Sequence, residues 1–445
     1  MMKQWNNSAL FRLIWPLLVE QILGVTIGLA DMIMVATVGE YAVSGVSLVE
    51  AINILLVMAF GALATGGSVV VGQYLGRGDR KSASHGAKQL IYVSTAAAFI
   101  VMGITLLLYR PLLRAIYGNI APDVMAAAQT YFWLTAFGYP FLALYNAGAA
   151  LFRSAGNSRV TMSVAVMVNI LNIGGNGILI FGFHLGITGA AIATLASRIA
   201  AAAVLMFLLL SRKSASVSLR GLFKIKIEPS MIRSILNVGI PSGLENSMFQ
   251  LGKILVSRIF TAFGTSAIAA NAVSGVINSF SFMPGSAFAL AILTVVSQCL
   301  GAQDYEAARY FTAKLIKMTY GVMIFANLMI LIFMNPILLF FNLSAEAVEF
   351  SKTFLWVHCI ASPLTWPLSF ALPNALRAAG DARYCMIIAV ISMWTIRVSA
   401  SYLLAYPLGL GPISVWYAMA GDFCLRSACY VWRWIGGRWE NKRVI

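Results

Sequence analysis

Residues 69–83 read VVVGQYLGRGDRKSA, and residues 294–308 read TVVSQCLGAQDYEAA. The two stretches superimpose without a gap when the chain is compared with itself at an offset of 225 residues. A register that stays unbroken over about 70 residues indicates an internal duplication. The same offset pairs further residues upstream: Pro16 with Pro241, Glu20 with Glu245, Gly39 with Gly264 and Asn53 with Asn278.

A second repeated pair follows the first in each half of the chain. RSAGNSR at 153–159 matches RAAGDAR at 377–383 at an offset of 224. The halves are joined by RKSASVSLRGLFKIKIEP, residues 212–229. We therefore predict four segments, which are an N-lobe at 1–211, a cytoplasmic linker at 212–233, a C-lobe at 234–434 and a cytoplasmic tail at 435–445.

The composition indicates a membrane protein. The 445 residues are 60% hydrophobic and only 10% charged, with a mean hydropathy of +0.84, whereas about a quarter of the residues of a soluble domain are charged. An apolar run of about 20 residues spans a bilayer as a helix. Twelve such runs lie near 10–37, 43–73, 89–108, 127–151, 160–182, 188–210, 234–262, 267–299, 313–334, 353–376, 384–406 and 412–434.

The repeat and the apolar runs together predict the fold class. We expect an all-α integral membrane protein with twelve transmembrane helices in two pseudo-symmetric six-helix lobes. Because six is an even number, both lobes would enter the membrane the same way round, related by an axis along the membrane normal. Transporters of this kind hold substrate between or within their halves, which favours a carrier.

The net charge of +16 marks a membrane face rather than a nucleic-acid surface. With both termini in the cytoplasm, the cytoplasmic segments collect 23 of the 31 Lys and Arg residues, the opposite loops three, and the helices five. We predict a multi-pass protein of the cytoplasmic (inner) membrane with both termini cytoplasmic. The expected partners are membrane lipids and a small substrate, and no nucleic acid.

Other functional classes find little support in the residues. A membrane transferase would need an acidic metal-binding motif or a His-containing loop, and a channel would more often assemble from short chains. His85, His184 and His358 lack metal-ligand spacing, and no GxxxxGK[ST] loop for ATP is present. We therefore predict no enzyme, no metal site and no cofactor other than a coupling ion.

Asp31 stands out among the acids within the apolar runs. A charged Asp in the middle of a helix costs about 2.5–3.5 kcal/mol on insertion, so it usually faces a cavity or a partner. Its repeat mate is Val256, so the repeated scaffold does not require an acid there. A carboxylate in an apolar setting holds a proton more readily than one in water. We predict that Asp31 carries the coupling ion; the alternative is a structural, hydrogen-bonded carboxylate.

The run 160–182 offers neighbours for Asp31. Asn169, Asn172 and Asn176 are spaced i, i+3 and i+7, which puts them on one helical face. They either join helices by hydrogen bonds or form a polar cluster beside Asp31. In the second reading Asn172 and Asn176, with Thr194 from the next run, complete the cation-coupling group, and Asn169 joins Asp31 in binding substrate.

The remaining charged motifs have structural interpretations. Glu20 and Glu245 each follow a proline by four residues, which suggests that they satisfy polar groups loosened by the proline kink. Asp422 and Arg426 are four apart and predict a helix-surface ion pair. Asp79 and Asp304 are expected to cap helices or hold an arginine, and Arg153, Arg159, Arg377 and Arg383 to anchor helix ends at lipid headgroups.

Taken together, these motifs resemble the MATE family, the multidrug and toxic compound extrusion transporters. The matching pieces are GLADMIMVATVG at 28–39, the QxLGxxD and RxxGxxR loops, NILNIGGNGILIFG at 169–182 and GPISVWYAMAGDFCLRS at 411–427. The resemblance implies export of organic cations and other amphiphiles, driven by an inward H⁺ or Na⁺ gradient. It also implies an acid in the N-lobe cavity at the position of Asp31.

The chain departs from the family at three positions. Asn176 stands where many members have an Asp in the fifth helix. One subgroup has a Glu in helix 7 and an Asp in helix 10, and the matching positions here hold Phe249 and Trp366. The resemblance thus implies no cation site in the C-lobe and argues against a Na⁺ mechanism of that subgroup's kind.

The predicted substrate residues follow from this pattern. Phe249 and Trp366 offer aromatic faces near the lobe interface. Lys253 has two interpretations. Its side chain either snorkels or pairs with Glu50 or Glu245, or it faces the central cavity and favours anionic or zwitterionic ligands. We predict a monomeric, H⁺-coupled secondary exporter of an amphiphilic organic solute. The alternatives are a flippase for a lipid-linked precursor and an exporter of an anionic or zwitterionic metabolite.

Overall fold

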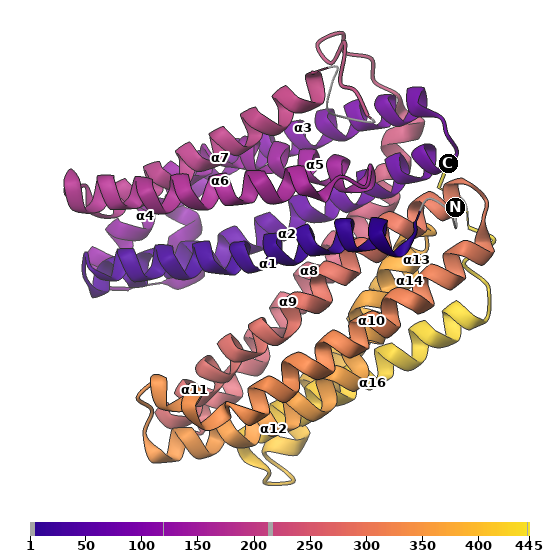
Figure 1. Cartoon of the computed structure of the whole chain (residues 1–445). Helices are drawn as coiled ribbons and strands as arrows, with labels where there is room; N and C mark the ends of the chain where they lie inside the picture. Colours follow the sequence, from indigo (N-terminus) through magenta and orange to yellow (C-terminus); the bar gives the residue numbers. More distant parts are fainter. Residues whose placement is uncertain (1–4, 119, 212–216, 443) are drawn as a thin grey trace. The chain divides into compact units, whose positions relative to one another are not determined.

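The computed structural model describes residues 5–118, 120–211, 217–442 and 444–445, and every regular element within these ranges is a helix (Figure 1). Part of the predicted linker, residues 212–216, lies outside them. The all-helical prediction is therefore confirmed for the described part of the chain.

The chain divides into two compact units. We call Phe11–Gly243 the N-terminal unit, and Leu244–Val444 with residues 5–10 the C-terminal unit. The division falls inside helix α8 (Pro229–Ala262), ten residues after the predicted start of the C-lobe at 234. The lobe and linker boundaries proposed from the sequence stay predictions.

The helices of the N-terminal unit follow one another with short connections, and they pack along one another in Figure 1. They are α1 (Asn7–Ala36), α2 (Glu40–Gly76), α3 (Arg80–Tyr117), α4 (Pro122–Ala136), α5 (Tyr139–Ser154), α6 (Ser158–Asn176) with the π-helical turn η1 (Gly177–Gly182), and α7 (Gly186–Leu210).

The C-terminal unit begins inside α8, and its long helices follow in the same order as those of the N-terminal unit. It contains α9 (Thr265–Gly301), α10 (Tyr305–Ile332), α11 (Met334–Phe340), α12 (Ala345–Trp366), η2 (Pro367–Ala371), α13 (Leu372–Ala378), α14 (Ala382–Ser392), η3 (Met393–Val398), α15 (Ser399–Ala405), η4 (Gly411–Ile413) and α16 (Ser414–Ile435).

Nine helices of the described residues are long and apolar enough to cross a membrane. Three predicted spans are helical but do not meet that standard. The run 127–151 is split between α4 and α5, since Pro140 cannot donate the backbone hydrogen bond that would continue the helix. Helices α8 and α16 carry several charged residues each. The count of twelve spans stays a prediction.

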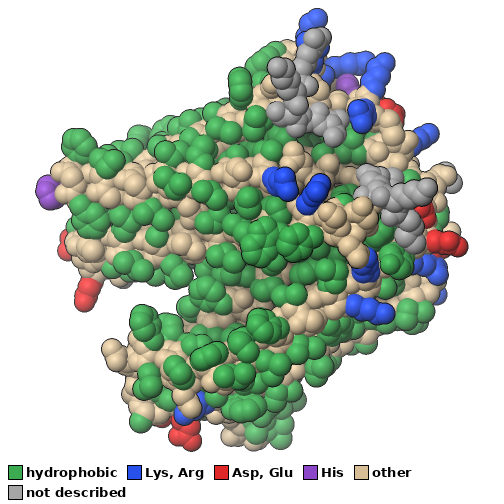
Figure 2. Space-filling view, in the orientation of Figure 1, with side chains coloured by type: hydrophobic (Ala, Val, Ile, Leu, Met, Phe, Trp, Pro, Cys, Tyr) green, Lys and Arg blue, Asp and Glu red, His purple; other side chains and the backbone are tan. Residues whose placement is uncertain are grey.

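The flanks of the helices are apolar, as lipid contact requires. Leu107 of α3 is 81% exposed and Phe207 of α7 is 71% exposed, which would be unfavourable in water. Figure 2 shows hydrophobic side chains over most of the visible helix flanks of both units, and most visible Lys and Arg side chains toward helix ends. A soluble domain would place charged side chains along these flanks.

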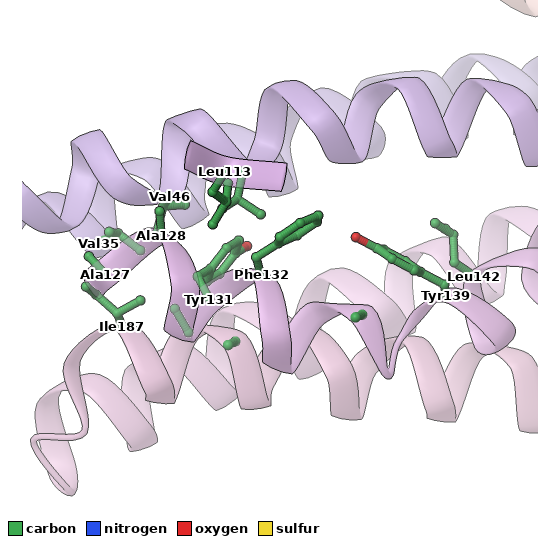
Figure 3. Packing of buried hydrophobic residues seen from close by; sticks show 14 of the residues in the cluster. Val35, Val46, Leu113, Ala127, Ala128, Tyr131, Phe132, Tyr139, Leu142 and Ile187 are labelled. Carbon is green, nitrogen blue, oxygen red and sulfur yellow. The ribbon is translucent and has the colours of Figure 1, made fainter. Parts of the chain in front are cut away.

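The core of the N-terminal unit is built from small and aromatic side chains. Tyr131, Phe132 and Tyr139 are buried between α2, α3 and α7, with alanines that allow close packing (Figure 3). A Cβ added at Gly45 of α2 would lie 2.7 Å from the Cβ of Ala127, so only glycine fits at this helix contact. This core holds α4 against the helices that carry the candidate site.

The duplicated loop has the same structure in both units. Asp79 accepts a hydrogen bond from the Ser82 backbone N–H at 2.9 Å and caps α3, and Asp304 accepts one from the Ala307 backbone N–H at 3.0 Å and caps α10. The preceding residues, Gly78 and Gln303, have φ angles of 83° and 57°. The predicted capping role of both aspartates is confirmed.

The Asp79 cap gives a pH-dependent prediction. The hydrogen bond donated by the Ser82 backbone N–H, the largest cause, holds the pKa of this carboxyl below its usual value of about 4. A lowered folded-state pKa means that the stabilisation is present at neutral pH and is lost as the pH falls through that pKa. Asp79→Ala should therefore lower the thermal unfolding temperature at neutral pH, and less so in strong acid.

Asp123→Ala is the matched control for this measurement. Asp123 is an exposed acid in the first turn of α4, where Ala121 at the cap position makes no side-chain cap. An Asp79→Ala effect that stayed constant between neutral and acidic pH would contradict the capping explanation.

The two membrane glutamates form equivalent ion pairs, which corrects two predictions. Glu20 binds Arg153 at 2.7 Å and accepts from the Thr161 hydroxyl at 2.7 Å. Its repeat mate Glu245 accepts two hydrogen bonds from Arg377, at 2.8 and 2.7 Å. The glutamates thus satisfy arginines rather than backbone groups near the prolines, and Arg153 and Arg377 are held by protein carboxylates rather than by lipid headgroups.

Candidate functional site

Asp31 lies near the end of α1 and binds the last residue of α6. Asn176 Nδ2 donates a hydrogen bond to Asp31 Oδ1. Asn176 is fully buried, whereas Asp31 is half-buried. The amide therefore holds one oxygen of the carboxylate.

Two further predicted residues extend this contact into a chain of polar groups. Asn176 Nδ2 lies 3.4 Å from Asn172 Oδ1, and Asn172 Nδ2 donates to Thr194 Oγ1 at 3.3 Å. The structure thus brings together Asp31, Asn172, Asn176 and Thr194. It does not join Asn169 to them, because Asn169 Nδ2 donates to the Ala165 carbonyl within its own helix at 3.0 Å.

Small residues allow α6 and α7 to approach closely enough for these contacts. A Cβ added at Gly175 would lie 3.1 Å from the Cβ of Ala193, and one added at Gly189 would lie 3.1 Å from Leu179. The π-helical turn η1 begins directly after Asn176, and such turns often occur at functional sites. The Asn172–Thr194 contact depends on this close packing.

A pocket of about 80 Å³ opens beside Asp31 in the N-terminal unit. Helices α1, α2, α4 and α7 contribute its walls. The lining residues are Gly28, Asp31, Met32, Val35, Val43, Val46, Ser47, Glu50, Tyr131 and Ala190. Two of the lining residues, Asp31 and Glu50, carry carboxylates. Most of the other lining residues are apolar.

Glu50 is a pocket residue that the sequence suggested only as a possible ion-pair partner of Lys253. Its Oε1 accepts hydrogen bonds from Asn53 Nδ2 at 2.9 Å and from the Tyr131 hydroxyl at 3.0 Å. The Tyr139 hydroxyl donates to Asn53 Oδ1 at 3.0 Å. Tyr131 and Tyr139 appear in Figure 3 with their hydroxyl oxygens. The i, i+3 spacing of Glu50 and Asn53 was the available signal, since it puts both on one face of α2.

Arg198 of α7 is the nearby cation in this unit. It interacts electrostatically with Asp31, and its Nη1 is buried with no hydrogen-bond partner among the described residues. A carboxylate pair beside one guanidinium can bind a cation or exchange a proton. The pocket therefore places ionisable groups beside an apolar wall, and its volume of about 80 Å³ is smaller than the roughly 300–1,000 Å³ of pockets that enclose a drug-sized ligand.

The predicted residues of the C-terminal unit lie in a different environment. Trp366 is 5% exposed and stacks on Phe282 and Phe370, at centroid distances of 5.5 and 5.4 Å. Phe249 contacts Phe370 edge-on at 6.0 Å, and the Cζ atoms of Arg397 and Arg426 lie 5.2 and 5.4 Å from its ring centroid. Trp366 is thus buried among aromatic rings, and the ring of Phe249 lies beside two guanidinium groups; the substrate roles of both residues stay predictions.

Two predicted ion pairs have different outcomes. Asp422 and Arg426 are joined at 2.8 Å, so the pair is confirmed, but their exposures of 0% and 1% show that it is buried rather than on the helix surface. Lys253 is exposed and forms no ion pair with Glu245, because Glu245 is bound to Arg377. Helical spacing accounts for the Asp422–Arg426 contact, whereas the packing of distant helices decides its burial and the partner of Glu245.

A family model described as MatE matches the chain twice, over residues 16–178 and 241–403. The two matches cover more than half of the chain and begin at the repeat mates Pro16 and Pro241. The chain therefore belongs to the MatE family of transporters, as the motifs indicated. Since members of this family are transporters, the family supports the prediction that the chain is not an enzyme.

Known relatives cover the chain almost end to end. It is 27% identical over 450 residues to a probable multidrug resistance protein NorM of Thermotoga maritima, which covers 99% of this chain and 94% of that protein. It is 26% identical over 443 residues to the uncharacterized transporter YisQ of Bacillus subtilis, covering 98% and 96%.

Solved structures share the fold. An outward-facing multidrug resistance MATE family transporter of the MOP superfamily matches with a TM-score of 0.90 at 20% identity, over 96% of this chain and 95% of that one. A MOP superfamily transporter from Pyrococcus furiosus, described as having a binding pocket of reverse polarity, matches with a TM-score of 0.91 at 20% identity, over 98% and 96%.

Proposed function

We propose that this member of the MatE family is a secondary active exporter that expels amphiphilic organic compounds in exchange for protons. Relatives named as probable multidrug resistance proteins support multidrug efflux. In this proposal the protein needs no cofactor beyond the coupling ion and works as a monomer in the cytoplasmic membrane. The placement of 23 of its 31 Lys and Arg residues supports cytoplasmic termini.

The Asp31–Asn176 contact is the observation that carries proton coupling. An ionised Asp31 accepts the Asn176 amide N–H, whereas a protonated Asp31 can donate to an amide oxygen after the amide rotates. Asn176 Oδ1 is buried without a hydrogen-bond partner among the residues that the structure describes. Asn176 can therefore form a hydrogen bond with Asp31 whether Asp31 is ionised or protonated. An Asp at position 176 could do this only by changing its own protonation state.

The mechanism follows from the two carboxylates in one pocket. An organic cation at the mouth of the pocket is attracted by ionised Asp31 and can contact the apolar residues that line the opening. Protonation of Asp31 from the outside removes that negative charge and weakens the attraction. Proton uptake and release of the organic compound are thereby linked at the same oxygen atoms.

The test is efflux from proteoliposomes that contain the purified full chain and a fluorescent cationic dye. An imposed pH gradient should drive dye export, whereas a Na⁺ gradient without a pH difference should not. Empty liposomes with the same gradients correct for passive dye movement. Dye export that follows the Na⁺ gradient would contradict proton coupling, and dye movement that responds to neither gradient would contradict secondary transport.

Glu50 gives a separate prediction about affinity. Glu50→Gln keeps an oxygen that can accept from Asn53 and Tyr131 but removes one negative charge from the pocket. We expect binding of a cationic dye to weaken about tenfold, the loss of a charged contact of about 1.5 kcal/mol. Equilibrium dye binding to the detergent-solubilised protein measures this change.

Glu40→Gln is the control for Glu50→Gln. Glu40 is an exposed acid at the start of α2, so its replacement removes the same charge from the same helix outside the pocket. Equal weakening by the two replacements would show a general charge effect and remove Glu50 from the site.

A further inference from the structure

Arg397 is a buried arginine with unused hydrogen-bonding capacity. It lies in the π-helical turn η3 and is 8% exposed. Its Nε and Nη1 atoms have no hydrogen-bond partner in the described ranges of the chain. A guanidinium group has five N–H donors, and burying a charge without partners costs much free energy. A ligand that accepts from Arg397 would therefore remove an existing penalty.

Asp422 contributes only a long ion pair to Arg397, because its Oδ1 is already bound by two other groups. Arg426 Nε donates to Asp422 Oδ1 at 2.8 Å, and the Ser392 hydroxyl donates to the same oxygen. Arg397 Nη1 forms an ion pair with Asp422 Oδ2 at 3.7 Å, which is longer than a hydrogen bond, and among the described residues neither atom has a hydrogen-bond partner. One carboxylate thus faces two guanidinium groups.

Lys253 adds a third positive charge to this cluster. It lies on α8, one turn after Phe249, is exposed and interacts electrostatically with Arg397. Within the part of the chain that the structure describes, no carboxylate forms an ion pair with Lys253. Lys253, Arg397 and Arg426 against Asp422 leave an excess of two positive charges.

Aromatic rings fix the position of Arg397. Its Cζ atom lies 5.2 Å from the ring centroid of Phe249 and 5.8 Å from that of Phe423. Gly252 allows α8 to approach η3, because a Cβ there would lie 2.2 Å from the Cε of Met393. The guanidinium group is therefore held beside aromatic rings, and the exposed ammonium group of Lys253 interacts with it electrostatically.

We propose that Arg397, Lys253 and Phe249 form an anion-binding site in the C-terminal unit, which takes the carboxylate of an aromatic organic anion or zwitterion. The guanidinium group can donate paired hydrogen bonds to the two carboxylate oxygens, and Lys253 adds charge attraction. The proposal rests on the export function, since it names a substrate class for that exporter. The phosphate of a membrane lipid carries similar anionic oxygens and is the competing occupant.

The experiment compares three fluorescent probes that share a pyrene ring. Pyrenebutyrate is anionic, pyrenebutanol is neutral, and a pyrenyl trimethylammonium is cationic. Fluorescence anisotropy measures the binding of each probe to the full-length protein in phosphate-free detergent. Arg397→Gln and Lys253→Met should each weaken pyrenebutyrate binding about tenfold, as the loss of a charged hydrogen bond predicts, and should leave the other two probes within about twofold.

Arg258→Gln is the matched control. Arg258 is exposed on the same helix as Lys253 and lies outside the contacts of the cluster, so it removes an equal charge elsewhere. The pyrenebutanol affinity of each variant reports whether its fold is retained, and Lys253→Met, at an exposed position, keeps the test valid if Arg397→Gln does not fold. Equal pyrenebutyrate affinity in the parent, Lys253→Met and Arg258→Gln would overturn the anion site.

Two additional arms separate the possible explanations. Displacement of pyrenebutyrate by short-chain phosphatidylglycerol, with no pyrenebutyrate export from proteoliposomes, would assign the site to a lipid headgroup and overturn the substrate assignment. Arg397-dependent pyrenebutyrate binding together with pH-driven pyrenebutyrate export would support it. If cationic dye is exported while Arg397→Gln and Lys253→Met leave the pyrenebutyrate affinity unchanged, the anion site is wrong. The export function is then still supported.

Discussion

Replacing Asp31 by Asn is expected to abolish the response of dye efflux to a pH gradient. Asn has nearly the same shape and can still contact Asn176, but it cannot bind and release a proton. If Asp31 carries the coupling proton, the gradient-driven rate of dye efflux should fall by at least about a hundredfold, to the passive rate. The variant lacks the group whose protonation links efflux to the pH gradient. Efflux from proteoliposomes, with and without the gradient, measures the loss.

The same variant should still bind an uncharged amphiphilic dye. The pocket wall is largely apolar and unchanged, so neutral dye affinity should stay within about threefold of the parent. Glu40→Gln again serves as the charge control. If Asp31→Asn exports dye under a pH gradient as fast as the parent does, Asp31 has a structural role, and Glu50 becomes the remaining carboxylate of the pocket for coupling.

Replacing Arg377 by Met is expected to give the largest loss of stability. The change leaves Glu245, which is 8% exposed, without the guanidinium that now binds both of its oxygens. Removing one partner of a buried ion pair typically costs about 3–5 kcal/mol, because the other charge remains buried and unpaired. Thermal unfolding of the detergent-solubilised protein should show a marked decrease in the midpoint temperature.

A double replacement distinguishes the ion pair from a simple loss of packing. Glu245→Gln with Arg377→Met removes both charges and should recover part of the lost stability. Arg383→Gln is the control, because Arg383 belongs to the same RAAGDAR loop but is exposed. If the double variant is no more stable than Arg377→Met, the cost arises from packing, and the ion-pair explanation is wrong.

The equivalent pair in the N-terminal unit shows why such contacts escaped prediction. Glu20 and Arg153 are 133 residues apart, and Glu245 and Arg377 are 132 apart. The sequence placed each glutamate after a proline and each arginine at a helix end, and both statements are correct locally. Which helices face one another determines the partner, and neither spacing nor composition contains that information.

The sequence predicted the candidate site only in part, for the same reason. The spacing of Asn172 and Asn176 predicted one polar helical face, because residues three and four apart on a helix point in the same direction. The direction of that face toward Asp31 and Thr194 required the packing of α1 and α7 against α6. The role of Glu50 emerged only from its contact with Tyr131, which is 81 residues away in the chain.

The sequence by itself determined the helical membrane fold, the internal repeat, the caps at Asp79 and Asp304, and the MATE family resemblance. These features follow from apolar run length, from periodicity and from residues close in the chain. Only the tertiary structure decided that Asp422 is buried with Arg426, that Arg397 lacks a full partner, and that Asp31 and Glu50 share a pocket. Such properties depend on which side chains from distant helices meet, since burial and charge balance are set by neighbours in space.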